Sequence, residues 1–152
     1  MNKSVMIVGV GGQGTLLASR ILGDAMMSQG FDVKVSEVHG MSQRGGSVVT
    51  YVRYGDKVYS PIIETGEADI LLSFEQLEAA RFLPYLKEGG TVVTSTQQID
   101  PMPVVTGEKE YPQGLLLSLI HIYLGVSKPG ACCWENRKGP LQPQQAPFST
   151  FF

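Results

Sequence analysis

A chain of 152 residues, 43% hydrophobic and 17% charged, is long enough for one domain with a hydrophobic core. The net charge of -2 offers no electrostatic attraction for nucleic acid or for an anionic membrane, so we expect neither as a partner. The sequence shows no signal peptide and no run of about 18 apolar residues, which predicts a cytoplasmic protein without a membrane span.

The chain begins with a predicted strand over Ser4–Val8, a continuous apolar run of the kind buried on both faces of a parallel sheet. A glycine turn follows, and behind it a helix is predicted over Thr15–Gln29, ended by Gly30. Apolar residues recur along this helix at three- and four-residue steps, so we expect one apolar face made of Leu16, Leu17, Ile21, Leu22, Ala25 and Met26.

The glycine turn has the spacing G-x-G-x-x-G at Gly9, Gly11 and Gly14, in the strand–turn–helix context that this spacing requires. Gly12 and Gln13 lie inside the same turn, where Gln13 is expected to add an amide to the rim. Because N–H groups at a helix start point outward with the positive end of the helix dipole, the turn is a candidate anion-binding rim. The competing interpretation is that the glycines only shape the corner between strand and helix.

A second strand is predicted over Asp32–Val38, so that Val5–Val38 forms a βαβ unit with parallel pairing and a right-handed crossover. The loop that follows, His39–Gly46, is expected on the same rim as the glycine turn, since ligands of open α/β sheets bind outside the carboxyl ends of strands. Besides the residues of the turn, the predicted rim contains Glu37, Ser42, Gln43, Arg44, Gly45 and Gly46.

Two side chains of this region carry alternative roles. Arg44 is permanently charged and can bind an anion through two hydrogen bonds, or it can form a structural ion pair with an acid such as Glu37. His39 is a weak candidate for a catalytic proton carrier, and a lone loop histidine more often serves as a hydrogen-bonding spacer. No other catalytic residue and no metal site are predicted.

The next part of the chain is predicted as a β-hairpin over Ser47–Tyr54 and Lys57–Ser60. Four acids around the strand that follows are expected to form a solvated face: Glu64, Glu67, Asp69 and Glu75. The further predicted elements are a strand over Ala68–Phe74, a helix over Glu75–Leu83, a strand over Thr91–Thr96 and a surface segment over Ile99–Pro112.

The character of the sequence changes after Gly114, which predicts a domain over residues 1–114 and an atypical tail over 115–152. The tail has four prolines, and it has three Lys or Arg residues against one Glu. Its hexapeptide LSLIHI also matches the translation of a common sequencing-library adaptor, so the tail is expected to be either non-native sequence or a real apolar segment with a disordered tail. The two cysteines, Cys132 and Cys133, are adjacent and lie in this tail, so any iron–sulfur cluster is expected on another chain.

As a motif alone, the glycine turn together with Glu37 at the end of the second strand indicates a dinucleotide site in which the acid binds the ribose hydroxyls. Glycine turns and acids at strand ends are each frequent by themselves. Longer segments of the chain favour a different assignment.

Three segments occur in one order: GVGGQG at residues 9–14, SEVHGMSQRGGSV at 36–48 and YSPIIETGEADILLSFEQLEAARFLPYLKEGGTVV at 59–93. They resemble the gamma-type domain of the 2-oxoacid:ferredoxin oxidoreductases, and among these the small (beta) subunits of indolepyruvate:ferredoxin oxidoreductases. The resemblance covers about residues 3–113. It implies an α/β, Rossmann-like fold with a mostly parallel sheet and a β-hairpin insertion. The resemblance also implies a longer family domain, so its C-terminal part is expected to be missing or replaced in this sequence.

The resemblance also implies a subunit, inactive alone, of an enzyme that oxidatively decarboxylates indolepyruvate or related aryl-pyruvates to acyl-CoA and passes electrons to ferredoxin. Thiamine diphosphate and iron–sulfur clusters are then expected on a large partner subunit, through which ferredoxin is reached, with coenzyme A as co-substrate. Two alternatives stay open: a Rossmann oxidoreductase that binds NAD or FAD itself, and a non-catalytic scaffold subunit.

Overall fold

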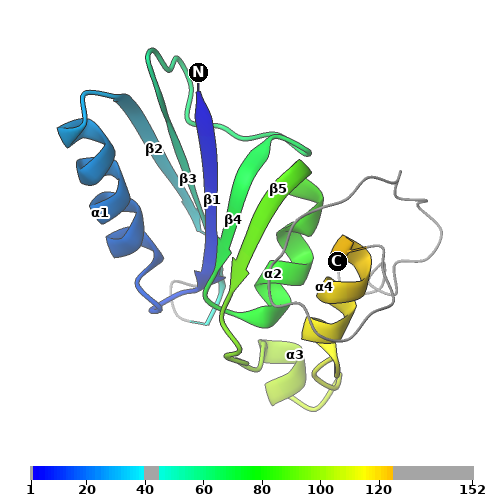
Figure 1. The fold of residues 1–152 in the computed structure, drawn as a ribbon. Coiled ribbons are helices and arrows are strands. Elements are labelled where there is room, and N and C mark those ends of the chain that lie inside the picture. The colour runs from blue at the N-terminus through cyan, green and yellow to red at the C-terminus, as the bar shows by residue number, and fades with distance from the viewer. Residues whose placement is uncertain (1, 40–44, 125–152) are drawn as a thin grey trace.

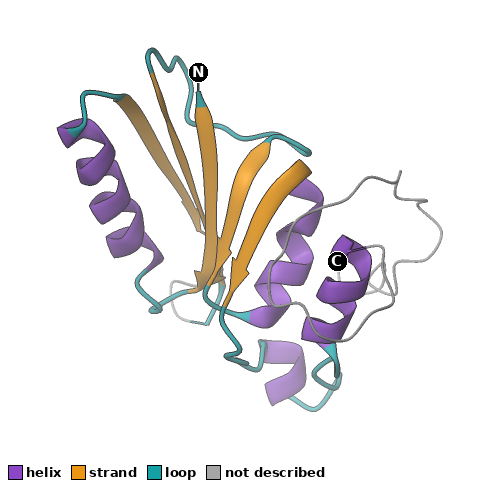
Figure 2. Cartoon of the chain, viewed as in Figure 1, coloured by secondary structure: helices purple, strands orange, loops and turns teal. Residues whose placement is uncertain are grey.

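The computed structural model describes residues 2–39 and 45–124. Five strands form one sheet in the order β2-β3-β1-β4-β5, with helices on both faces (Figure 1, Figure 2). The predictions for Ser42, Gln43, Arg44 and the tail beyond residue 124 lie outside the described residues. The strands are β1 (Lys3–Val10), β2 (Asp32–His39), β3 (Ser47–Gly55), β4 (Ala68–Ser73) and β5 (Leu86–Thr94).

The described strands run mostly in one direction. β4 pairs in parallel with β1 and with β5, whereas β3 pairs antiparallel with β1 and with β2. β2 therefore points the same way as β1, and among the described strands β3 alone opposes the others. The predicted fold class, an α/β fold with a mostly parallel sheet and a β-hairpin, is confirmed.

The predicted parallel pairing of the first two strands is wrong. β3 lies between β1 and β2 and is hydrogen-bonded to both, with Val52 opposite Val5 on one side and opposite Val35 on the other. Val49 and Val52 of β3 are buried on opposite faces of the sheet, as expected for a strand in its interior. Because β3 has apolar residues on both faces, it is stable between two other strands. It therefore separates β1 and β2, the two strands that α1 connects.

The predicted hairpin partner of β3 is also wrong. β3 turns back on β2, and residues 57–60 form no strand. The N–H of Val58 donates to Asp32 Oδ2 at 2.8 Å, and the Asn2 side chain donates to the carbonyl of Lys57 at 3.0 Å. These two bonds hold the chain after β3 against the starts of β1 and β2, where it cannot pair along β3.

Helices cover both faces of the sheet, each over different strands. Helix α1 (Thr15–Ser28) packs on β2 and β3, and helix α2 (Gln76–Phe82), continued by the 3-10 turn η1 (Leu83–Tyr85), packs on β1 and β4 (Figure 1). Alternate residues of β1 serve the two faces. Val5 and Ile7 belong to the core on the α1 side, while Met6 and Val8 belong to the core on the α2 side.

The face by which α1 packs differs from the predicted one. Its buried residues are the small ones, Thr15, Ser19 and Gly23, and a Cβ at Gly23 would lie only 3.6 Å from a methyl of Val35. Leu22 and Met26 are half-buried and Ala25 is exposed. Leu16, Leu17 and Ile21 point away from the sheet with exposed fractions of 39%, 63% and 61%. Small side chains let the helix approach the sheet closely, and the large aliphatic ones are left outside.

The chain after β5 returns to α2. It contains the short helix α3 (Met102–Val105) and helix α4 (Leu115–Leu124), which lies beside α2 in Figure 1. Tyr111 and Leu115 are buried together against Leu77 of α2, so the segment predicted to lie on the surface contributes Tyr111 to the core. Packing continues past Gly114 into the first turns of α4.

Two of the acids expected in a solvated face are bonded within the protein instead: Glu75 is buried and Asp69 is partly buried. Glu75 is 1% exposed and is the N-cap of α2, where its carboxylate accepts from the N–H of Glu78 at 2.9 Å. The same carboxylate accepts from the Tyr111 hydroxyl and from the N–H of Ile99. Asp69 binds three donors at the opposite end of β4. Hydrogen bonds from protein donors replace those that water would give to each carboxylate, and this lowers the cost of removing it from solvent.

Candidate functional site

The glycine turn connects β1 to α1 at the carboxyl end of the sheet (Figure 1). Gly12 and Gly14 have φ of 98° and 86°, a region that residues with a side chain adopt at a cost. Helix α1 has no side-chain cap at Gly14, so the N–H groups of its first turn keep the positive end of the helix dipole available. The turn therefore has the backbone of an anion-binding corner.

The turn is joined to the loop that follows β2. The N–H of Gly11 donates to the carbonyl of Gly46 at 2.9 Å, so the two predicted parts of the rim touch. Gly45, with φ of 76°, and Gly46 are the described residues of that loop, since 40–44 lie outside the described range. The proposed contributions of Ser42, Gln43 and Arg44 stay predictions.

A cavity of about 470 Å³ opens beside the turn. Its lining comes from the glycine turn, the first turns of α1 and the end of β2. From the sequence, the turn and the end of β2 were placed together only because ligands of open α/β sheets bind outside the carboxyl ends of strands. Gly9 and Gln13 of the predicted rim do not line it. The lining residues are Gly11, Gly12, Gly14, Thr15, Leu16, Leu17, Arg20, Glu37, His39 and Val48.

Arg20 supplies a cation to this cavity and was not predicted from the sequence. It follows Leu16 and Leu17 by four and three residues, so all three side chains share one side of α1. That spacing groups Arg20 with the two leucines, but it does not indicate that this side of α1 lines the cavity. Arg20 is exposed, so its guanidinium is free to meet a ligand without first losing a buried partner.

Glu37 and His39 form the polar wall of the cavity opposite the helix. His39 Nδ1 lies 3.6 Å from Glu37 Oε1, close enough for an ion pair when the imidazole is protonated. Glu37 Oε2 is buried and has no hydrogen-bond partner among the residues that the structure describes. The Glu37 carboxylate would repel a phosphate, whereas the Arg20 guanidinium and the start of α1 would attract one, so the lining of the cavity combines anion-attracting groups with a hydrogen-bond acceptor.

A second cluster of polar side chains, Ser47, Glu78 and Arg81, lies between the start of β3 and helix α2. The Ser47 hydroxyl and the Arg81 guanidinium, the latter at 3.0 Å, donate to the two oxygens of Glu78. Burial raises the pKa of the Glu78 carboxyl above its usual range, and these two donors oppose the rise only in part. Glu78 thereby links α2 to the strand that follows the 40–46 loop.

Among residues 2–39 and 45–124, no cluster of three or more histidine, cysteine or acidic side chains could hold a metal ion. None of the helices in these ranges is both long and apolar enough to span a bilayer.

Comparison with known proteins assigns the chain to one family. The family model described as "Pyruvate ferredoxin/flavodoxin oxidoreductase" matches residues 4–124. The chain belongs to this family. The match includes the glycine turn, both cavity walls and helix α4.

Several of the curated relatives are named as subunits of indolepyruvate oxidoreductases. The chain is 51% identical over 109 residues to "Indolepyruvate oxidoreductase subunit IorB" of Pyrococcus horikoshii, covering 72% of this chain and 54% of that protein. It is 46% identical over 112 residues to the subunit of the same name from Methanothermobacter thermautotrophicus, covering 74% and 57%. The chain thus spans about half the length of the relatives that it matches.

Solved structures agree on the fold. The gamma subunit of a keto/oxoacid ferredoxin oxidoreductase from Geobacter sulfurreducens is 27% identical, with a TM-score of 0.50 over 65% of this chain and 56% of that one. A 2-oxoglutarate:ferredoxin oxidoreductase from Magnetococcus marinus gives a TM-score of 0.56 at 19% identity, over 74% of this chain and 18% of that chain. In that enzyme the fold is a small part of one long polypeptide.

Proposed function

We propose that the chain is a small subunit of an oxidoreductase that oxidatively decarboxylates indolepyruvate or related aryl-pyruvates to acyl-CoA and passes electrons to ferredoxin. The observation that carries the proposal is the identity of 42–51% to four indolepyruvate oxidoreductase subunits over 109–113 residues. Thiamine diphosphate, iron–sulfur clusters and the ferredoxin contact are assigned to a large partner subunit. A cytoplasmic location goes with this assignment.

Within this proposal, the cavity beside the glycine turn binds the phosphate-bearing part of coenzyme A. The uncapped start of α1 and the Arg20 guanidinium favour an anion, and a volume of about 470 Å³ is in the usual range for small-molecule sites. Glu37 and His39 would accept and donate hydrogen bonds to polar groups of the same ligand. In this arrangement the chain's residues bind and orient the co-substrate, while the acyl group is formed on the partner.

The exposed apolar residues of α1 suggest where that partner lies. Leu16 and Leu17 both line the cavity and project from the outer side of α1, next to Ile21. A co-substrate in the cavity has to reach a cofactor on the other subunit, so the partner is expected at the mouth of the cavity, over this side of α1. Burial of these side chains would contribute to the association.

Two measurements test the proposal. Titration calorimetry of the full chain should show binding of coenzyme A and no binding of NAD or FAD, whereas binding of either dinucleotide would favour the Rossmann oxidoreductase alternative. The chain should also be co-expressed with a large indolepyruvate oxidoreductase subunit and assayed for indolepyruvate-dependent ferredoxin reduction. A large subunit with the same turnover in the absence of the chain would favour the scaffold alternative.

A further inference from the structure

Gln13 was expected to present its amide to a ligand, but the amide is turned into the protein. Its Oε1 accepts from the N–H of Val10 at 2.7 Å, and its Nε2 donates to the carbonyl of Phe74 at 3.0 Å and to Gln97 Oε1 at 3.1 Å. Both amide hydrogens and the oxygen are therefore used. The two acceptors around Nε2 fix the orientation of the amide, because the oxygen could not replace the nitrogen there.

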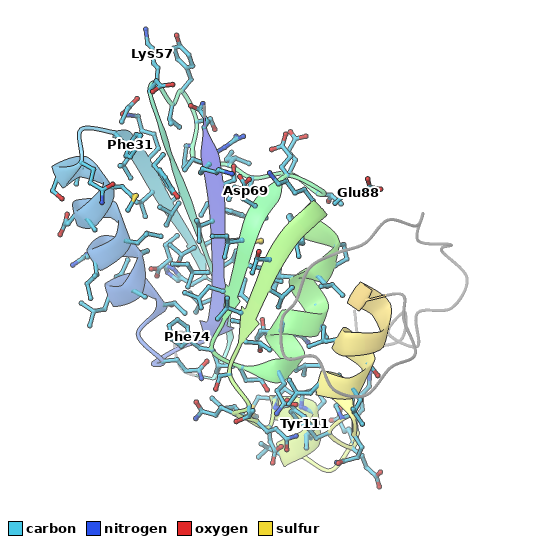
Figure 3. The ribbon with its side chains drawn as sticks, in the orientation of Figure 1. Phe31, Lys57, Asp69, Phe74, Glu88 and Tyr111 are labelled. Atoms are coloured by element: carbon cyan, nitrogen blue, oxygen red, sulfur yellow. The ribbon has the colours of Figure 1, made fainter. Side chains whose placement is uncertain are left out.

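These partners come from three different segments that meet at the carboxyl end of the sheet. Val10 ends β1, Phe74 follows β4, and Gln97 follows β5. Figure 3 shows Phe74 at this lower end of the sheet, beside the corner that leads from β1 into α1. The segment after β5 is itself held to α2, since the N–H of Gln76 donates to the carbonyl of Gln97 at 3.2 Å.

The bonds of Gln13 close the backbone of a turn in which two N–H groups lack an acceptor among the described residues. The backbone N–H of Gln13 donates to the carbonyl of Val10, so backbone and side chain close the same four-residue turn in both directions. The N–H groups of Val10 and Gly11 are bound internally. Those of Gly12 and Gly14 have no acceptor within the described part of the chain.

We infer that Gln13 is a positioning residue, which holds the glycine turn in the shape that aims the N–H groups of Gly12 and Gly14 at an anion. This role rests on the proposed function for the identity of the anion, coenzyme A. The holding of the turn by the Gln13 amide does not depend on that identity. Gln13 touches no ligand in this assignment and acts through the backbone.

The test compares the full chain with three variants. Gln13→Met keeps the length and neutrality of the side chain but removes its hydrogen bonds, Gln97→Ala removes one of the three bonds, and Gln98→Ala changes an exposed neighbour as a control. The measurements are amide hydrogen exchange at Val10 and the affinity for inorganic pyrophosphate. The KM for coenzyme A and kcat are then measured in the complex with the large subunit.

Gln13→Met is expected to speed exchange at Val10, to weaken pyrophosphate binding about tenfold and to raise the KM for coenzyme A with kcat unchanged. Gln97→Ala should give a smaller change in the same direction, and it keeps the inference testable if Gln13→Met fails to fold. Gln98→Ala should match the wild type. Unchanged exchange at Val10, or faster exchange with undiminished pyrophosphate affinity, would overturn the positioning role.

Failure of the proposed function gives a different result. If the unmodified chain binds neither pyrophosphate nor coenzyme A, the assignment of the cavity is wrong and Gln13 positions no anion site. Faster exchange at Val10 in Gln13→Met would still show that the amide holds the turn.

Discussion

At the scale of single residues, the cavity combines features that were predictable with one that was not. The glycine turn follows from its spacing, because few residues other than glycine adopt the positive φ of Gly12 and Gly14. Arg20 lies in a helix and outside any motif, and its place in the cavity depends on which side of α1 faces the sheet. The sequence could not reveal that without the packing.

Arg20→Ala should weaken binding of coenzyme A or pyrophosphate to the full chain by about tenfold, because it removes a charge-assisted hydrogen bond to the anion. The unfolding midpoint should not change, since Arg20 is exposed. Lys57→Ala is the control: Lys57 is an exposed cation at the opposite end of the sheet, as Figure 3 shows. Equal affinities of the two variants would contradict a role for Arg20.

Two glycines give a matched pair for stability. A Cβ at Gly9 would lie 2.9 Å from Gln13 Oε1 and 3.0 Å from Thr15 Cγ2, so Gly9→Ala should destabilise the fold by about 1–3 kcal/mol. In α1, a Cβ at Gly23 would meet Val35 at 3.6 Å, an ordinary contact. Gly23→Ala should therefore raise the free energy of unfolding by about 0.5–1 kcal/mol, as helix propensity favours alanine. Urea unfolding of both variants measures the difference, and a stable Gly9→Ala variant would argue against the crowding at the turn.

At the scale of elements, the periodicity of the sequence placed most strands and helices but not their partners. α1 begins at the predicted residue, yet Leu16, Leu17 and Ile21 were assigned to the wrong side because the helix packs through Thr15, Ser19 and Gly23, with Leu22 half-buried beside them. Small residues carry little weight in a hydrophobic pattern, although they decide how closely a helix approaches a sheet. The position of β3 was equally hidden, since an alternating apolar pattern predicts a strand but not the strands with which it pairs.

The two sides of α1 should respond differently to the same substitution. Ile21→Ser should leave the stability of the chain unchanged within about 0.5 kcal/mol, because Ile21 is 61% exposed, but should reduce co-purification with the large subunit. Leu22→Ser should lower the free energy of unfolding by about 1–3 kcal/mol, because Leu22 packs against the core on this face of the sheet. Undiminished co-purification of Ile21→Ser would place the partner elsewhere.

Asp69 ties three strands together at the amino end of the parallel part of the sheet. Its carboxylate accepts from the N–H of Ser4 at 2.8 Å, from Lys3 at 3.2 Å and from Lys87. Partial burial raises its pKa, but the bonds from Lys87, Ser4 and Lys3 outweigh that effect and hold the pKa below its usual range.

A depressed pKa in the folded state means that Asp69 stabilises the fold above its unfolded pKa of about 3.9, and that this contribution is lost as the pH falls through the lower folded value. The free energy of unfolding should therefore fall as the solution is acidified from about pH 5 to pH 2. Asp69→Asn should make this acid limb less steep. Identical pH profiles of the two proteins would show that the carboxylate is not coupled to folding.

At the scale of the whole molecule, the chain spans about half of its indolepyruvate oxidoreductase relatives, and the family match extends to residue 124. The boundary proposed at Gly114 rests on composition, whereas Leu115 is 2% exposed and Leu119 is 3% exposed. Composition describes a segment and not its contacts, so this packing could not be read from it.

The purified full chain should contain no stoichiometric iron and should not oxidise 2-oxoacids, because its first 131 residues contain no cysteine. Colorimetric iron determination and a viologen reduction assay with indolepyruvate measure both. The same assays on the complex with the large subunit serve as the positive control. Iron bound to the chain alone, with absorption from a cluster, would contradict the assignment of clusters to the partner.

The central place of β1 has a consequence for synthesis on the ribosome. Val8 pairs with Val49 and with Ser73, so β1 leaves the exit tunnel before β3 and β4, the two strands with which it pairs. Until those strands emerge, its apolar run remains unpaired, next to a helix that lacks the sheet on which it packs. Distant pairings of this kind slow folding and leave exposed strands open to aggregation. The nascent chain is therefore expected to need protection by chaperones until Ser73 has emerged.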